Sequence, residues 1–404
     1  MKRLWDKGEP LDERILRYTA GEDHELDGRL VEYDVRASIA HANMLNQQGL
    51  LPDEDLRAIK DGLEALASSH AEGDWDISLE DEDVHTALET RLTDDIGEAG
   101  KRIHLGRSRN DQVLAALRLY LLDAADALED NAEAVADTLE ALGSREADTP
   151  LPGYTHMQQA MPSSVSEWAN GFAAEIRDDA RGIAASRRRL SKNPLGSAAG
   201  YGTPGLPIDR NATCDELGFD IVHEPVTAVQ LSRGKAEAGL VFELCMLMQD
   251  LGRLSTDLLL FYTQEFSFIT LPNSMTTGSS IMPQKRNPDV LELVRGGTAT
   301  MQACLAEIMG ITAKIGSGYQ RDLQRIKPPL FRAIDMAGES AEIMVPLIDG
   351  LEFERENIYL DASIYAAGRA NRIVLEEGIS FREAYLRVAE ELERESENDP
   401  EARD

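Results

Sequence analysis

Positive charge is scarce in this chain. Its 404 residues include 41 Lys and Arg against 73 Asp and Glu, a formal net charge of −32 at pH 7. Nucleic-acid binding needs clustered positive charge, so we expect no nucleic-acid partner. Such acidity is typical of a solvated acidic surface, as in proteins that work at high salt, where charges are strongly screened. An acidic surface that docks a partner is the alternative.

Cysteines and long apolar runs are also scarce. The three cysteines, Cys214, Cys245 and Cys304, are far apart and odd in number, which indicates reduced thiols that act as small apolar side chains. Even the apolar stretch at 240–251 is interrupted by acidic residues, and no run reaches the 18 residues of a membrane span. The N-terminal charges are not followed by an apolar stretch, unlike a secretory signal. We therefore expect a cytoplasmic protein with no membrane partner.

Glycine and proline are absent from residues 110–142, where apolar residues recur at nearly helical spacing. A helix of that length would extend about 50 Å at a rise of about 1.5 Å per residue. Further long helices are predicted over 164–190, 233–266 and 290–311. Long helices with apolar residues on more than one face need a bundle, with partners from other chains. The sequence therefore predicts an all-α fold.

Smaller helical units flank the predicted bundle. The first hundred residues favour shorter helices near 35–46 and 55–68, and the pattern changes again after about residue 351. The bundle region also contains most of the helix-poor loops that hold unusual residue clusters. We expect three domains: an N-terminal helical domain over 1–108, a central long-helix bundle over 109–351, and a short C-terminal helical domain over 352–404.

The segment at 278–289 is the most informative one, and it reads Gly-Ser-Ser-Ile-Met-Pro-Gln-Lys-Arg-Asn-Pro-Asp. Its glycine and small hydroxyls open a loop that can close over a ligand. Ser279 can take or give a proton, and Lys285 is a point charge able to hold a developing oxyanion. Asn287 follows, beside a rigid proline. The segment resembles the signature loop of the fumarase/aspartase superfamily, whose members abstract a proton next to a carboxylate and release fumarate.

A second cluster stands at 104–112, just before the longest predicted helix. Arg107 and Arg109 can grip carboxylates by paired hydrogen bonds, and Asn110 can orient an amide or carboxylate at the helix start. The alternative is a capped helix N-terminus with a local ion pair between Arg109 and Asp111. Because basic residues oppose the helix dipole at that end, the pattern favours ligand binding.

A Thr-His pair, Thr155 and His156, lies in a Pro/Gly-rich loop at 151–158, which would place both side chains at a helix entrance. An imidazole titrates near neutrality, as a proton-transfer group should. A lone histidine is more often structural, but its occurrence beside the other clusters favours a catalytic role.

A fourth segment, 318–327, spaces Tyr319, Gln324 and Lys327 so that they can share one flank of a helix. They would serve there either as ligand-binding groups or as part of a solvated amphipathic face.

Two residues have the spacing of a pair of metal ligands on one helix. His85 and Glu89 stand four apart, as metal ligands on one helix do, but no third ligand is apparent. The spacing therefore favours a hydrogen bond between them on a helix surface. A GxGxxG pattern occurs at 200–205, but no plausible phosphate-binding helix follows it, and the sequence has no Walker loop.

Together these clusters resemble argininosuccinate lyase more than the superfamily at large. The run Arg-Ser-Arg-Asn-Asp-Gln at 107–112 is the most telling, and Gln284 before the loop lysine also fits this family. Three further runs follow the family pattern: Ser-Ile-Ala-His-Ala at 38–42, Tyr-Thr-His-Met-Gln at 154–158 and Asn-Pro-Leu-Gly-Ser-Ala-Ala-Gly at 193–200.

The resemblance implies three mostly helical domains and a homotetramer whose core is a long helix bundle, with active sites shared by three subunits. The implied reaction is the reversible β-elimination of argininosuccinate to arginine and fumarate, a step of arginine biosynthesis.

The resemblance implies Ser279 as the base, with Lys285 and Asn287 holding the doubly charged aci-carboxylate. It implies His156 as a second proton-transfer group, assisted by Thr155 and by Glu292 as its carboxylate partner. Substrate-binding positions would be Arg109, Asn110, Tyr319, Gln324 and Lys327. Neither a metal nor an organic cofactor is implied.

The chain departs from the family pattern in places. Ser-Arg-Gly-Lys at 232–235 replaces the common Ser-Asp-Arg-Asp, and Gln320 stands where an asparagine is usual. Two alternatives stay open. One is a related lyase acting on another N-succinyl or aminosuccinate compound, which the retained 107–112 run disfavours. The other is a non-catalytic structural homologue of the crystallin kind, which the intact serine, lysine and histidine disfavour.

Overall fold

The structure is a computed structural model that describes residues 12–398. The described residues are overwhelmingly helical, and the predicted all-α class is confirmed. The chain divides into two compact units. The first unit comprises Met1–Asp130, Asp179–Met248 and Gly297–Glu339, and the second comprises Asn131–Asp178, Gln249–Gly296 and Ser340–Asp404. The three-domain division expected from the sequence stays a prediction.

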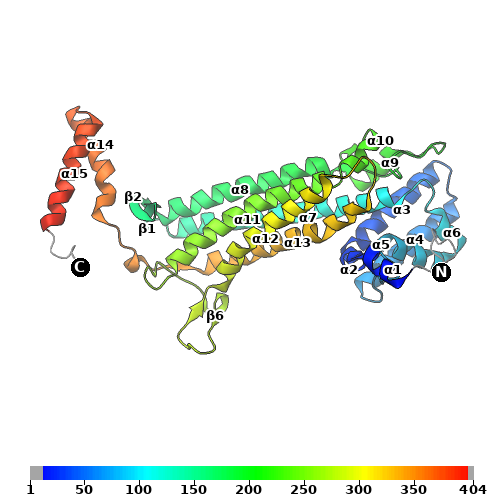
Figure 1. The fold of residues 1–404 in the computed structure, drawn as a ribbon, viewed down its shortest axis with the longest axis horizontal. Helices are drawn as coiled ribbons and strands as arrows, with labels where there is room; N and C mark the ends of the chain where they lie inside the picture. Colours follow the sequence, from blue (N-terminus) through cyan, green and yellow to red (C-terminus); the bar gives the residue numbers. More distant parts are fainter. Residues whose placement is uncertain (1–11, 399–404) are drawn as a thin grey trace. The chain divides into compact units, whose positions relative to one another are not determined.

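Five long helices of the described residues, drawn in Figure 1, contribute residues to both units by their position in the chain. They are α7 (Arg109–Arg145), α8 (Val165–Leu190), α11 (Lys235–Phe261), α12 (Asp289–Thr312) and α13 (Lys327–Gly350). The first four confirm the helices predicted from periodicity. The fifth was not predicted, because its prolines interrupt the pattern: two stand in its first turn, where no intrahelical N–H is required, and Pro346 lies inside it.

Helix α11 ends about five residues earlier than predicted, because the chain folds back on the helix end. The backbone N–H of Phe268 donates to the carbonyl of Phe261 at 2.8 Å. The rings of the same two residues lie 5.8 Å apart, centroid to centroid. Phe261 also packs near Trp168 of α8, whose indole N–H donates to Asp257 at 3.0 Å. These contacts form an aromatic core within the second unit.

The first unit contains the N-terminal helices. They are α1 (Glu13–Ala20), α2 (Asp23–Leu26), α3 (Val31–Gln47), α4 (Asp53–Ala71), α5 (Val84–Ile96) and α6 (Glu98–Arg102), with the 3-10 helix η1 (Asp27–Leu30). Helices α3 and α4 confirm the two shorter helices predicted there. Helix α3 packs against α4, α5 and α9 (Arg210–Leu217) and is buried along much of its length. The unit also contains α10 (Val226–Leu231), η3 (Arg321–Ile326) and the short parallel pair β3 (Lys192–Asn193) and β4 (Ile221–Val222).

Gly297 of α12 lies against two other long helices in the first unit. A Cβ at this position would lie 3.1 Å from Cε of Met248 on α11 and 3.2 Å from Sδ of Met336 on α13. A side chain there would require the ends of both methionines to shift by a few tenths of an ångström.

The second unit contains the antiparallel hairpin of β1 (Pro150–Thr155) and β2 (Gln158–Ser164). Two more antiparallel pairs join β5 (Ile269–Thr270) to β8 (Glu352–Phe353) and β6 (Thr277–Gly278) to β7 (Arg286–Asn287). Short 3-10 helices are η2 (Asn273–Met275), η4 (Arg355–Asn357) and η5 (Ala362–Tyr365). Helices α14 (Ala366–Glu377) and α15 (Phe381–Asn398) pack on each other around a small apolar cluster of Ala370, Ala384 and Val388.

Among the described helices, none combines the length and the apolarity that a membrane crossing requires.

Candidate functional site

Helix α7 begins with a reciprocal cap that also joins two of the predicted motifs. The backbone N–H of Ser108 donates to Oδ1 of Asp111 at 2.9 Å, and the Ser108 hydroxyl accepts the N–H of Asn110 at 3.3 Å. The other carboxylate oxygen of Asp111 accepts the N–H groups of Gly196 (3.0 Å) and Ala198 (2.7 Å). Burial raises the pKa of Asp111, although these donors oppose the shift. The loop after α8 is thereby fixed to the start of α7.

Arg109, the first residue of α7, points to the N-terminal end of α5. Its guanidinium donates to Asp83 at 3.1 Å and to the hydroxyl of Thr86. Its side chain is 33% exposed, so part of it is accessible to solvent. The alternative of an ion pair between Arg109 and Asp111 is wrong, because the Asp111 carboxylate is buried against backbone N–H groups.

Two residues of the 107–112 motif, Arg107 and Gln112, belong to a buried polar network. The carboxylate of Asp34 is within 2.9 Å of Nδ1 of His85 and accepts a hydrogen bond from Gln112 at 3.1 Å. Arg107 is buried as well and donates to the hydroxyl of Ser38 at 2.8 Å. Two motifs far apart in sequence, 38–42 and 107–112, therefore belong to one buried network.

The charges of this network stabilise one another. Burial alone would lower the pKa of His85, but the Asp34 carboxylate raises it. Burial would likewise raise the pKa of Asp34, but His85 and Arg107 lower it. His85 and Asp34 are therefore a buried ion pair. The predicted surface hydrogen bond between His85 and Glu89 is wrong, because Glu89 instead lies 3.4 Å from His104.

Lys327 is buried at the start of α13 between two carboxylates. Its ammonium lies 2.6 Å from Asp27 and 3.2 Å from Asp23. Burial would lower the pKa of Lys327, but Asp27 and Asp23 raise it. Burial also raises the pKa of Asp23 to about 6, although the charge of Lys327 opposes that shift. The sequence did not single out these aspartates, which come from the segment around α2 and η1.

Gln324 contacts the N-terminal segment, and Tyr319 does not share a helix with it. The side-chain amide of Gln324 donates to the carbonyls of Thr19 (2.9 Å) and Ala20 (2.8 Å). Tyr319 precedes η3 in an irregular segment, with the guanidinium carbon of Arg233 5.1 Å from its ring centroid. The predicted shared helical flank is wrong, because the chain forms a 3-10 helix and only then begins α13 at Lys327.

In the second unit, Thr155 ends β1 and His156 stands at the tip of the β1–β2 hairpin. The predicted loop at a helix entrance is therefore a strand pair with a two-residue turn. His156 and Met157 make that turn with φ of 52° and 61°, the left-handed backbone of a tight hairpin. Thr155, His156 and Met157 are all exposed.

The 278–289 segment forms a loop whose two ends are joined by the β6–β7 pair. Asn287 donates to the Thr277 hydroxyl at 3.3 Å and to the Gly278 carbonyl at 3.4 Å. At the other end of the loop, directly after β6, the Ser279 hydroxyl accepts hydrogen bonds from the backbone N–H groups of Ile281 (3.4 Å) and Met282 (3.2 Å). The side chain of Lys285 is exposed.

The structure thus divides the predicted site residues. Those for substrate binding lie in the first unit, apart from Asn287, which shares one loop of the second unit with Ser279 and Lys285. His156 and Glu292 are also in the second unit, and both are exposed. Over residues 12–398, no hydrogen bond joins His156 to its predicted partner Glu292.

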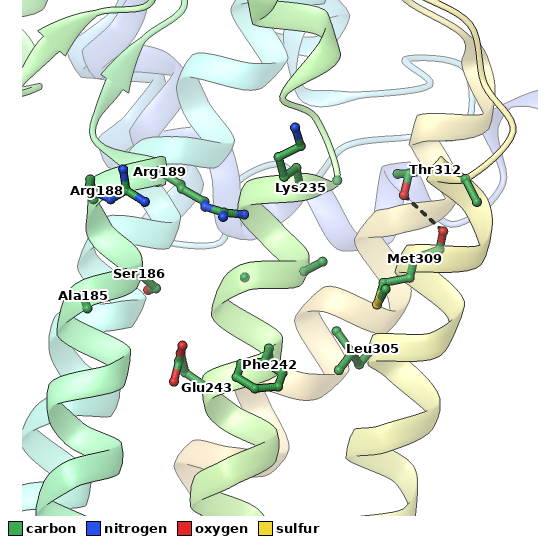
Figure 2. Close-up of a pocket in the computed structure, with 14 residues that line it drawn as sticks. Ala185, Ser186, Arg188, Arg189, Lys235, Phe242, Glu243, Leu305, Met309 and Thr312 are labelled. Carbon is green, nitrogen blue, oxygen red and sulfur yellow. Dashed lines mark hydrogen bonds between the residues drawn. The ribbon is translucent and has the colours of Figure 1, made fainter.

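A cavity of about 740 Å³ lies in the first unit among α8, α11 and α12 (Figure 2). Arg188, Arg189 and Lys235 line its basic side, and Phe242, Leu305 and Met309 line an apolar side. None of the predicted site residues lines this cavity.

Comparison with known proteins places these motifs in a family. A model of the lyase family matches residues 13–303. The chain is 46% identical over 392 residues to the argininosuccinate lyase of Sorangium cellulosum, covering 96% of this chain and 90% of that protein. It is 37% identical over 398 residues to the argininosuccinate lyase of Thermotoga neapolitana, covering 98% and 100%.

Solved structures show the same fold. A structure of EDDS lyase in complex with formate has a TM-score of 0.78 at 24% identity and covers 94% of this chain and 76% of that chain. A class II fumarase from Schistosoma mansoni has a TM-score of 0.77 at 17% identity and covers 93% and 91%. Given the match to the lyase model and nearly full-length identities of 37–46%, this chain belongs to the argininosuccinate lyase family.

Proposed function

We propose that this protein cleaves argininosuccinate into arginine and fumarate, reversibly, in the biosynthesis of arginine. The observation that carries the proposal is the 46% identity, over 96% of the chain, to the argininosuccinate lyase of Sorangium cellulosum. The reaction removes a proton next to a carboxylate and expels a guanidinium nitrogen from the neighbouring carbon, so it needs a base, anion-stabilising donors and a group that assists the leaving nitrogen.

Ser279 is the proposed base. The two backbone N–H groups that donate to its hydroxyl, at 3.2 and 3.4 Å, support this role because they favour a deprotonated oxygen. Lys285 and Asn287 of the same loop would hold the doubly charged aci-carboxylate. One well-placed donor contributes about 3–4 kcal/mol to such a transition state, so several must act together.

His156 is the proposed second proton-transfer group, with Thr155 beside it and Glu292 as its carboxylate partner. Its exposed position at a hairpin tip supports a role that another molecule completes. Substrate binding is assigned to Arg109, Asn110, Tyr319, Gln324 and Lys327. Neither metal nor organic cofactor enters the proposal.

The proposed assembly is a cytoplasmic homotetramer in which each active site takes residues from three subunits. The exposure of Lys285 and His156 supports it, because groups on the surface of one chain can be covered by another. The partners are therefore the small-molecule substrate and further copies of the chain.

The decisive experiment measures fumarate release by ultraviolet absorbance from purified protein given argininosuccinate, at low and at high salt. Light scattering on the same sample gives the oligomeric state. We expect turnover, with higher activity in molar salt because the net charge of −32 is then screened. A tetramer that releases no fumarate at either salt would contradict the proposal and favour another N-succinyl substrate or an inert homologue.

A further inference from the structure

The tip of the β1–β2 hairpin, which carries His156, is weakly held by its own strands. The register of the pair shifts between Gly153 and Tyr154, so a bulge separates the last two rungs of the ladder, those of Gln158 and Gln159, from the others. A two-stranded pair is only marginally stable by itself in water. The tip of this hairpin therefore needs a support from outside the pair.

The side chain of Gln159 provides such a support within the second unit. Its amide nitrogen donates to the carbonyl of Tyr359 at 2.9 Å, and its amide oxygen accepts the backbone N–H of Asp361 at 2.9 Å. Both distances are those of well-formed hydrogen bonds. The two ends of one side chain thus bind alternate residues of a segment that lies 200 and 202 positions further along the chain.

The segment that receives these bonds, the strap, comprises residues 352–361 and is itself fixed. At its start β8 pairs with β5, and further along the Asn357 amide donates to the Ser267 carbonyl at 2.9 Å. At its end the Asp361 carboxylate caps η5 by accepting the N–H of Ser363 at 2.8 Å, and η5 in turn contacts β2. Gln159 therefore binds a segment that is anchored on both sides of the contact.

The base of the hairpin has its own connections to this part of the chain. Arg145, at the end of α7, donates to the carbonyl of Leu351 at 2.9 Å, and Arg355 of the strap donates to the carbonyl of Asp148, just before β1. Within residues 12–398, Gln159 is the one member of the tip, residues 154–159, that forms a hydrogen bond with the strap. Its loss would leave the base in place and release the tip.

We propose that Gln159 is a positioning residue that holds His156 in place by binding the hairpin tip to the strap. The inference rests on the proposed function, in which His156 transfers a proton. An imidazole on an exposed turn transfers a proton only in those molecules that hold it within reach of the substrate. Because both ends of the Gln159 amide are bonded to backbone, Gln159 raises that fraction through His156 and not by a contact of its own.

Gln159→Met keeps the approximate length of the side chain and removes both hydrogen bonds. Amide hydrogen exchange over residues 154–159 should become about 10-fold faster, because the tip opens more often. We expect kcat for argininosuccinate to fall by about 3- to 10-fold while KM stays within about 2-fold, since the groups that bind the substrate are unchanged. Gln249→Met is the matched control, because Gln249 is an exposed glutamine of the same unit whose side chain forms no hydrogen bond among the described residues. It should alter neither quantity.

A second substitution tests whether Gln159 acts through His156. Once His156→Asn has removed the imidazole, its position no longer matters, so adding Gln159→Met should lower kcat by less than about 1.5-fold more. The same factor in both backgrounds would overturn the proposal. So would an unchanged kcat in Gln159→Met with faster exchange, because the support would then be merely structural. If Gln159→Met does not assemble, Gln159→Asn, which keeps the amide on a shorter side chain, decides by the same readouts.

Hydrogen exchange separates this inference from the proposed function, because it needs no substrate. A wild type that releases no fumarate from argininosuccinate fails the proposed function. Unchanged exchange over 154–159 in Gln159→Met would overturn the inference even in an active enzyme. Faster exchange confined to those residues in an inactive wild-type background would support the link between Gln159 and the strap, and the failure would lie with the proposed function alone.

Discussion

Two lysines assigned to the active site have opposite environments. Lys327 of the first unit is 4% exposed, and its ammonium contacts Asp27 at 2.6 Å and Asp23 at 3.2 Å. Lys285 of the second unit is exposed on a loop, where its backbone N–H donates to the Met282 carbonyl at 3.0 Å. The first ammonium has a fixed position before any ligand arrives. The second keeps its conformational freedom.

The same difference separates the groups around them. Asp34, His85 and Arg107 form a buried network in the first unit, whereas Ser279 and His156 lie on a loop and a hairpin of the second. Removing one partner of a buried charge leaves the other uncompensated, but an uncharged or exposed side chain on a loop contributes less to stability. Substitutions in the first unit should therefore change the free energy of unfolding, and those in the second should change turnover.

Ser279→Ala should give the largest effect. We expect kcat to fall by about 10³-fold or more, because the proposed base is removed, while the free energy of unfolding changes by less than about 1 kcal/mol. Steady-state kinetics and urea unfolding at one protein concentration measure the two quantities. The control is Ser274→Ala, which removes an exposed hydroxyl just before the loop and should leave both unchanged. Near-normal kcat in Ser279→Ala would refute the assignment.

Asp34→Asn should mainly reduce stability. His85 would lose the carboxylate 2.9 Å away and stay buried, so we expect unfolding to become easier by about 3–5 kcal/mol. Asp123→Asn is the control within the same unit. It breaks a pair with Arg36 at 3.5 Å whose side chains are about half exposed, so its cost should stay below about 1 kcal/mol. Equal costs in urea unfolding at pH 7 would mean that burial does not distinguish the two pairs.

The sequence predicted the long helices because their signal is local. Periodicity within 110–142 is enough to indicate α7, and the same holds for α8 and α12. Helix α13 was not predicted, because proline in a first turn is taken as a break in the helical pattern although a helix tolerates proline there. The end of α11 depends on the packing of Phe268 against Phe261, which no periodicity encodes.

The polar pairs of the first unit were beyond sequence reasoning for a different reason. Asp34 and His85 are 51 residues apart, and Asp27 and Lys327 are 300 residues apart. Spacing rules apply within one element and contain no information on such pairs. His85 was consequently assigned to Glu89, its neighbour on the helix. The acidic residues at 27 and 34 precede the 38–42 motif, but nothing in the sequence distinguishes them from the other charged residues of the same stretch.

A histidine of the first unit should make stability depend on pH. His41 is fully buried, its Nε2 lies 2.8 Å from the Leu105 carbonyl, and burial lowers its pKa to about 3. A lowered pKa means that its contribution is complete above about pH 6.5 and is lost as pH falls towards 3, because the unfolded chain binds the proton first. At pH 5 this loss amounts to about 2 kcal/mol.

His41→Gln should remove that loss. We expect the decrease in unfolding free energy between pH 7.5 and pH 5 to be smaller in the variant than in the wild type by about 2 kcal/mol. His85 titrates in the opposite sense, since its pKa is raised, but it is present in both proteins and cancels in the comparison. Urea unfolding at the two pH values measures the difference, and parallel losses would exclude His41 as the buried titrating group.

The smallest expected effect lies at the exposed hairpin of the second unit. Met157 has a φ of 61° and is 69% exposed, so it bears the cost of a left-handed backbone with little buried surface to offset it. Met157→Gly should therefore stabilise the protein by about 0.5–1 kcal/mol.

Met161→Gly is the control, because Met161 is 50% exposed on the adjacent strand and is not among the residues of positive φ. It should destabilise by about 0.5–1 kcal/mol, since glycine weakens a strand. Opposite signs in urea unfolding would locate the strain in the turn that presents His156. A lower free energy of unfolding in both variants would mean that Met157 contributes contacts to its surroundings. The difference between the buried, paired side chains of the first unit and the exposed side chains of the second unit would then be smaller than these environments indicate.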